Sequence, residues 1–152
     1  MTSRDPIHCR ELLASLMAEE NAQLATLESL LVREHALLEA RDMEGLDEAA
    51  AARQQCVGHI LRIEDARLAL VRATGRDGDA AGLPGLLTWC DPSGLLRPVV
   101  QEYRDRTRRC REQNDRNGRL VGARLQRVDE TRAYGPGSGD TRGNGRLLTE
   151  RA

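Results

Sequence analysis

Residues that could do chemistry are few in this chain: four cysteines, three histidines and a polar run over residues 110–118. His8 adjoins Cys9, and Cys56 precedes His59 by three residues, which places this second pair on one face of a helix. Zinc is the metal that such pairs would bind, but structural zinc sites usually combine two closely spaced ligand pairs. Because the first pair is adjacent rather than spaced, we predict no metal site.

The polar run offers no catalytic arrangement. Cys110 would act as a nucleophile only with a histidine base beside it. A di-iron bundle would need Glu-x-x-His pairs on two helices, whereas no histidine here has a glutamate three residues before it. The chain contains no lysine, so it has neither a Schiff-base residue nor a P-loop. We therefore expect no catalytic residues, no cofactor, a protein that is not an enzyme, and a structural thiol at Cys110.

The remaining cysteines and histidines have structural interpretations. The four cysteines lie far apart without a Cys-x-x-Cys pair, which favours reduced, buried thiols in a cytosolic protein. His35 lies in an acidic segment and is expected to be solvated, whereas His59 is expected to lie at the edge of the core.

Composition and charge limit the partners. The 152 residues are 39% hydrophobic and 2% aromatic with a net charge of -1, which indicates one domain with a Leu, Ala and Val core and no nucleic-acid partner. No apolar stretch reaches the roughly 18 residues of a membrane helix, so we expect no membrane insertion and a cytoplasmic protein. Residues 1–50 carry eleven acids and four arginines, whereas residues 97–132 carry eleven arginines and six acids. These two segments should pack side by side; the alternative is a basic surface kept free for an acidic partner.

Helix caps and apolar periodicity predict a long helical hairpin. Asp5 followed by Pro6 is an N-cap with proline in the first turn, and no Gly or Pro follows before about Ala40. Asp42 can cap a second helix over 43–73 that is closed by a glycine, and the short break makes the pair antiparallel. The expected core stripe of the first helix is Leu13, Leu16, Leu24, Leu27, Leu31 and Leu38. That of the second is Leu46, Ala50, Arg53, Val57, Ile60, Glu64, Leu68 and Val71.

A short plug and a third long helix follow. Gly and Pro residues over 75–94 rule out a continuous helix. We expect the apolar residues among them to form a short helical turn that closes one end of the bundle: Leu83, Leu86, Leu87 and Trp89. The third helix should begin near Asp91 or Ser93, hold Pro98 in its first turn and run to about Ala133.

The predicted fold is all-α. It is an elongated antiparallel bundle of three long helices plus the short helical plug, which together form a helical bundle domain over residues 1–133. The glycine-rich segment that begins at Tyr134 has the composition of a flexible C-terminal tail, over residues 134–152.

The third helix carries a seam with a polar middle. Its residues alternate three and four positions apart, as in a coiled coil: Tyr103, Thr107, Cys110, Asn114, Asn117, Val121, Arg124 or Leu125, and Val128. Amides lie where packing alone would select Leu or Val. Such a layer fixes helix register at a cost in stability, so we predict a register-setting layer of Cys110, Asn114 and Asn117.

The same helix resembles a known family. Its pattern Cys-x-x-Gln-Asn-x-x-Asn-Gly-x-Leu-Val, followed by Tyr-Gly-Pro-Gly, is similar to that of the FlgN family of flagellar export chaperones, as is the layout of hairpin, plug and last helix. The matching residues are Cys110, Gln113, Asn114, Asn117, Gly118, Leu120, Val121 and Tyr134. The resemblance implies a cytosolic chaperone that holds C-terminal helical segments of hook-associated (hook-filament junction) proteins. It would prevent their premature assembly and deliver them to the flagellar type III export gate.

The resemblance also implies where partners bind. A client helix would fill an open groove of the bundle, against an apolar stripe on the last helix: Leu120, Val121, Leu125 and Val128. Tyr134 would contact the export gate. Gly118 and Gly122 have two interpretations, close helix packing or adaptable client binding. Because the residues just before Tyr134 are polar, Leu147 and Leu148 are further candidates for part of the contact.

Two other functions remain open. A structural or adaptor coiled coil would self-associate through the same groove, and a client-free chaperone could equally be a homodimer. A thiol or metal sensor would use Cys9, Cys56 and Cys110. A client peptide that binds at 1:1 and gains helicity separates the chaperone from the adaptor, and metal analysis with thiol titration tests the sensor.

Overall fold

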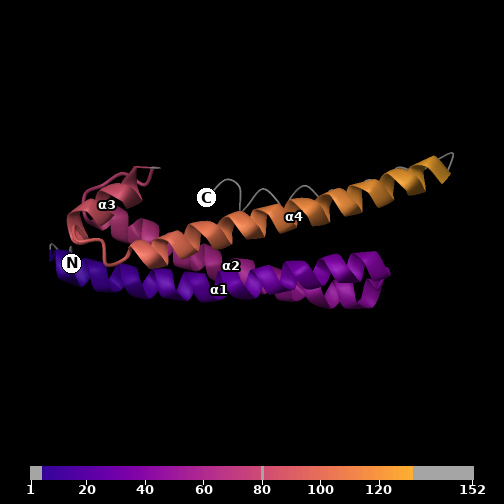
Figure 1. The fold of residues 1–152 in the computed structure, drawn as a ribbon, viewed down its shortest axis with the longest axis horizontal. Helices are drawn as coiled ribbons and strands as arrows, with labels where there is room; N and C mark the ends of the chain where they lie inside the picture. Colours follow the sequence, from indigo (N-terminus) through magenta and orange to yellow (C-terminus); the bar gives the residue numbers. More distant parts are fainter. Residues whose placement is uncertain (1–4, 80, 132–152) are drawn as a thin grey trace.

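The computed structural model describes residues 5–79 and 81–131, with side chains placed as far as Ala123. Its elements are four helices, α1 (Pro6–Ala40), α2 (Met43–Ala73), α3 (Gly82–Cys90) and α4 (Arg97–Thr131), and the described residues contain no strand. The three long helices form an elongated bundle with α3 at one end (Figure 1). The fold is all-α, as predicted, while the predicted tail over 134–152 lies outside the described residues.

The ends of the hairpin helices follow from local chemistry. The Asp5 side chain accepts a hydrogen bond from the Ile7 amide at 3.1 Å, and the Asp42 side chain accepts one from the Gly45 amide at 2.9 Å. Each carboxylate satisfies one of the amides that the first turn of a helix leaves without a partner. Arg41 adopts the left-handed conformation at φ 56° between the two helices. The bounds predicted for α1 and α2 are confirmed.

The core stripes differ in detail from those predicted. In α1 the stripe holds as a whole, but Leu16 is only half-buried and Met17 is buried in its place. The stripe predicted for α2 is wrong by one position over much of the helix. Its buried residues are Ala49, Cys56, Ile60, Ile63 and Val71. The predicted Ala50, Val57 and Glu64 are half-buried, because the face of α2 turned to α1 is centred one residue earlier along the chain.

The connection from α3 to α4 is tighter than the sequence predicts. Both carboxylate oxygens of Asp91 accept hydrogen bonds at 2.9 Å, from the amides of Leu95 and Leu96. Gly94 takes φ +76°, a conformation that side chains disfavour. These bonds hold residues 91–96 as a turn, so α4 begins at Arg97 and not near Asp91 or Ser93 as predicted.

The three long helices do not share contacts equally. α1 packs along both α2 and α4, whereas no Cα atom of α2 lies within 8 Å of one of α4 in the described residues. Leu24, Leu27 and Leu31 of α1 are fully buried in the core that the helices share. Leu86 and Cys90 of α3 extend this core at one end. In the described part of the chain, no helix has the length and hydrophobicity needed to span a bilayer.

Candidate functional site

The polar layer of α4 is anchored by Asn117. Its side chain is 5% exposed and donates from Nδ2 to the Leu31 carbonyl of α1 at 2.8 Å. Its Oδ1 accepts a hydrogen bond from Nε2 of Gln113 at 3.0 Å and lies 3.1 Å from Nδ1 of His35. A buried amide with all of these partners specifies one relative position of two helices, because a shift by a turn would leave it without them.

The other members of the predicted layer differ in burial. Cys110 is fully buried and its thiol donates to the Leu24 carbonyl of α1 at 3.6 Å. Asn114 is only half-buried, and its side chain forms no hydrogen bond to another described residue. The seam positions that precede Cys110, Tyr103 and Thr107, are buried. The interior layer therefore consists of Cys110 and Asn117 supported by Gln113, and including Asn114 in it was wrong.

The histidine interpretations also change. His35 is not simply solvated: besides its contact with Asn117, its Nε2 lies 2.7 Å from Oε1 of Glu39. The sequence shows only its acidic neighbours, whereas its partner on α4 is 82 residues away. His59 was expected to edge the core, but it is exposed because the buried face of α2 passes through Cys56 and Ile60 instead.

Beyond Asn117, α4 separates from the rest of the bundle. The bonds of Asn117 are the last hydrogen bonds between α4 and α1 in the described residues, and the end of α4 projects past the hairpin turn (Figure 1). A Cβ built on Gly118 or Gly122 meets no atom within 4 Å. Close helix packing, one of the two interpretations of these glycines, is therefore wrong for the described residues.

We call residues 118–131 of α4, which follow Asn117, the projecting half. The apolar stripe predicted to bind a client begins in this projecting half. Leu120 and Val121 are half-buried there. Leu125 and Val128 lie within α4, but their side chains are outside the description, as are Tyr134, Leu147 and Leu148 altogether. The structure thus brings Gln113, Asn117 and His35 together at the point where α4 leaves α1, with Cys110 about two helical turns before it and Gly118 and the first two residues of the stripe directly after it.

A buried ionic cluster lies nearer the middle of the bundle, and the sequence reasoning missed it. Glu20 of α1 is fully buried, 3.6 Å from Nη1 of Arg67 on α2. The guanidinium of Arg67 stacks over the Tyr103 ring of α4 at 4.7 Å and donates to its hydroxyl at 3.2 Å. Arg67 therefore joins α2 to α4 where their backbones do not meet. The sequence does carry a sign of this cluster, because Glu20 lies on the apolar stripe of α1, seven residues from both Leu13 and Leu27.

Burial and a neighbouring acid set the charge of this cluster. Desolvation raises the pKa of Glu20 to about 7; Arg67 opposes this rise and Glu64 adds to it. A second ion pair joins the same two helices, with Nε of Arg53 2.6 Å from Glu34. Fourteen residues separate the two acids on α1 and the two arginines on α2, in reverse order along the chain, which matches an antiparallel hairpin.

The predicted attraction between the acidic first helix and the basic last helix is confirmed at one position. Arg109 of α4 donates to Glu28 of α1 at 2.9 Å. The other ion pairs of α4 in the described residues lie within that helix, from Arg106 to Glu102 and from Arg108 to Asp105 and Glu112. Charge therefore contributes to the α1–α4 contact, but most of the arginines remain on the solvated face.

The thiols are unsuited to nucleophilic or metal chemistry. All four cysteines are buried, and desolvation raises the pKa of Cys110 to about 12 and raises the pKa values of Cys56 and Cys90. The thiolate is the reactive and metal-binding form, so burial suppresses both activities. In the described ranges no three His, Cys, Asp or Glu side chains are placed to hold a metal ion.

Comparison with known proteins adds a family and a fold. A family model described as FlgN protein matches residues 10–134. A crystal structure described as that of a flagella synthesis protein FlgN from Pseudomonas aeruginosa matches with a TM-score of 0.70. Its sequence is 23% identical, and the match covers 93% of this chain and 96% of that one. This likeness supports the elongated helical fold alone. No curated protein matches the sequence.

Proposed function

The chain belongs to the FlgN family of flagellar export chaperones, and from this premise we propose that it binds C-terminal helical segments of hook-associated proteins. In this proposal it keeps them from assembling early in the cytoplasm and delivers them to the export gate. The observation that carries the proposal is the course of α4, which leaves α1 after Asn117 with apolar side chains and open space beside it.

The geometry suits a helix-in-groove mode of binding. α1 has a long helix on two sides, but α2 and α4 have no backbone contact with each other in the described residues. An amphipathic client helix can place an apolar face against Leu120 and Val121. Gly118 and Gly122 lack side chains on this part of α4, so a client backbone can approach closely there.

A peptide from the C-terminal segment of a hook-associated protein tests the proposal. Titration calorimetry should give 1:1 binding to the full chain, and circular dichroism should show a gain of helix. Leu120→Asp should weaken binding by about tenfold or more, because burying a leucine contributes about 1.5–3 kcal/mol and 1.4 kcal/mol is tenfold in affinity. Ala123→Asp places the same charge on an exposed position of the same helix and should change affinity by less than about threefold.

Two results would contradict the proposal. One is the absence of peptide binding at micromolar concentration by a folded protein. The other is equal weakening by the two aspartate variants, which would mean that general charge and not the Leu120 surface controls binding. A protein that remains a dimer on dilution and ignores the peptide would favour the self-associating adaptor instead.

Delivery to the export gate is assigned to a different part of the chain. We place the gate contact at Tyr134, outside the described residues, so Tyr134→Ala should leave the peptide affinity unchanged while reducing secretion of the hook-associated protein in cells. Loss of peptide binding in this variant would instead place Tyr134 in the client site.

A further inference from the structure

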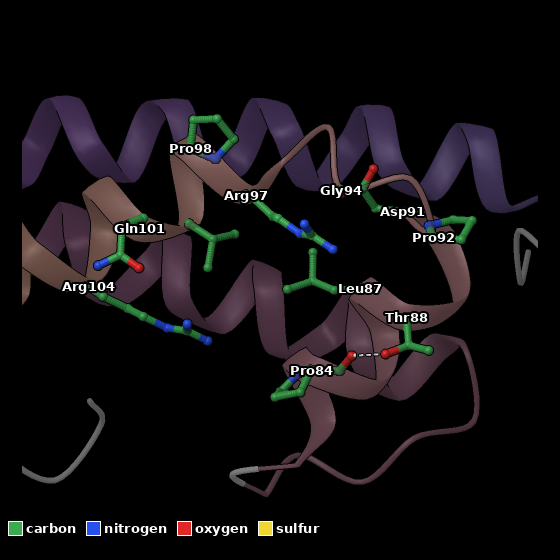
Figure 2. Close-up of a pocket in the computed structure, with 11 residues that line it drawn as sticks. Pro84, Leu87, Thr88, Asp91, Pro92, Gly94, Arg97, Pro98, Gln101 and Arg104 are labelled. Carbon is green, nitrogen blue, oxygen red and sulfur yellow. Dashed lines mark hydrogen bonds between the residues drawn. The ribbon is translucent and has the colours of Figure 1, made fainter.

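A hollow lies between α3 and the start of α4 (Figure 2). These elements are at the end of the bundle opposite the projecting half of α4 (Figure 1). Its volume is about 790 Å³. Apolar side chains from both helices line it, among them Leu87 of α3 and Val100 of α4, with Pro84 and Pro98 beside them. A hollow of this volume and lining can hold a short segment of a partner together with an aliphatic side chain.

Two arginines flank this apolar surface. Arg97 and Arg104 lie seven residues apart, so they share one face of α4 and are separated by roughly 10 Å along its axis. Both side chains extend from α4 toward α3 (Figure 2). Neither forms a hydrogen bond or ion pair with another residue in the part of the chain that the structure describes, and both are exposed.

The nearby acids are already engaged. Asp91, which lines the hollow, uses both oxygens to accept the amides of Leu95 and Leu96. Asp105 accepts from Gln101 at 3.0 Å and lies 3.5 Å from Arg108, and Glu102 is held by Arg106 at 3.0 Å. Asp91 keeps its negative charge, so two arginines and one aspartate give the lining of the hollow a net charge of +1 beside an apolar surface, an arrangement that favours a partner's carboxylates.

The turn before α4 helps to position the first arginine. A Cβ built on Gly94 would lie 2.6 Å from Nε of Arg97 and 2.9 Å from its Cζ. The space left by the missing side chain is therefore occupied by the Arg97 guanidinium. This contact holds Arg97 against the turn and across the hollow, which reduces the freedom it would lose on binding.

We propose that this hollow is a second docking surface, for a short extended acidic segment of a partner protein that inserts an aliphatic side chain between two carboxylates. In an extended segment, residues i, i+2 and i+4 point to one side and span roughly 13 Å, which is close to the roughly 10 Å that separates the two arginines along the axis of α4. Acid-x-aliphatic-x-acid is therefore the recognised pattern. The surface is separate from the client groove and its existence does not rest on the proposed function.

An NMR titration with synthetic peptides tests this proposal. The methyl groups of Leu87 and Val100 should shift when an acetylated, amidated Glu-Ser-Leu-Ser-Glu peptide is added to the methyl-labelled full chain, up to about 10 mM because exposed ion pairs are each weak. The Gln-Ser-Leu-Ser-Gln and Glu-Ser-Ser-Ser-Glu peptides should cause smaller shifts. Arg97→Gln and Arg104→Gln together should lower the affinity about fivefold or more, and Arg116→Gln, on an exposed part of the same helix, should leave it unchanged.

Three outcomes would overturn the proposal: equal shifts with the glutamine peptide, equal shifts with inorganic phosphate alone, or an unchanged affinity in the double variant. Phosphate-driven shifts would mean that the arginines bind small anions only. The double variant should still bind the hook-associated peptide with wild-type affinity. A failure at this hollow is thereby distinguished from a failure of the client groove.

Discussion

The buried carboxylate of Glu20 should make the stability of the protein fall as the pH rises. Its pKa is about 7 in the folded chain and 4.5 for an ordinary glutamate. Between these values the folded state binds more protons than the unfolded state, so the free energy of unfolding decreases with increasing pH. The contribution of Glu20 protonation to the free energy of unfolding is fully present below about pH 4.5 and is lost as the pH passes through 7.

The size of this effect follows from the same pKa values. One unit corresponds to about 1.36 kcal/mol, so the rise from 4.5 to about 7 corresponds to about 3 kcal/mol between pH 4.5 and pH values above 8. Glu20→Gln removes the titrating group while keeping the shape of the side chain. Its free energy of unfolding relative to the wild type should therefore increase by about 2–3 kcal/mol as the pH is raised from 5 to 8.5.

Urea unfolding followed by circular dichroism at several pH values measures this difference. Every other titrating group is common to the two proteins, so subtracting the two profiles isolates Glu20 together with its interaction with Glu64. Glu34→Gln removes another buried carboxylate of α1, one that Arg53 holds directly at 2.6 Å, and is the comparison variant for the loss of an acid–arginine pair with Glu20 left in place. Parallel profiles for wild type and Glu20→Gln would refute the reasoning, because they would show that Glu20 stays ionised in the folded state.

The remaining predictions concern the polar layer, the projecting half of α4 and the thiols. Asn117→Ala should cost about 1–3 kcal/mol in urea unfolding because its partners on α1 lose a buried bond, whereas Asn114→Ala should cost less than about 0.5 kcal/mol; equal costs would contradict the revised layer. Gly118→Ala should raise the free energy of unfolding by up to about 1 kcal/mol, and with it the thermal midpoint, because the new methyl group meets no atom. A lower thermal midpoint would instead reveal a contact at this position. Cys110 should resist alkylation at pH 8 until urea is added, because its pKa of about 12 keeps it protonated; rapid labelling of the native protein at Cys110 would refute this.

Helix boundaries could be predicted because their causes are local. Asp5, Asp42 and the glycine at 75 act on amides and carbonyls within a few residues, so their effects are visible in a short window of sequence. The seam of α4 could also be predicted, because its buried residues follow a regular spacing: Tyr103, Thr107, Cys110 and Asn117. The start of α4 was missed because it depends on which amides Asp91 accepts.

Features of the candidate site that join distant segments could not be predicted in this way. The buried positions Ala49, Cys56 and Ile60 of α2 are each followed by another apolar residue, so neighbouring faces of this helix look equally apolar in the sequence, and only packing on α1 selects one. His35 meets Asn117 from 82 residues away. The hollow depends on where α3 lies relative to Arg97 and Arg104, which no pattern within either helix specifies.

The two acid–arginine pairs of the α1–α2 hairpin have a consequence for misfolding. A hairpin of purely aliphatic stripes can slide by one heptad and still bury apolar surface. Here such a slip would move Glu20 from Arg67 to a position near Ile60 or Thr74, and would remove Glu34 from Arg53 at the same time. Each stranded carboxylate or guanidinium would cost several kcal/mol. The two ion pairs should therefore disfavour alignments of the hairpin shifted by one heptad.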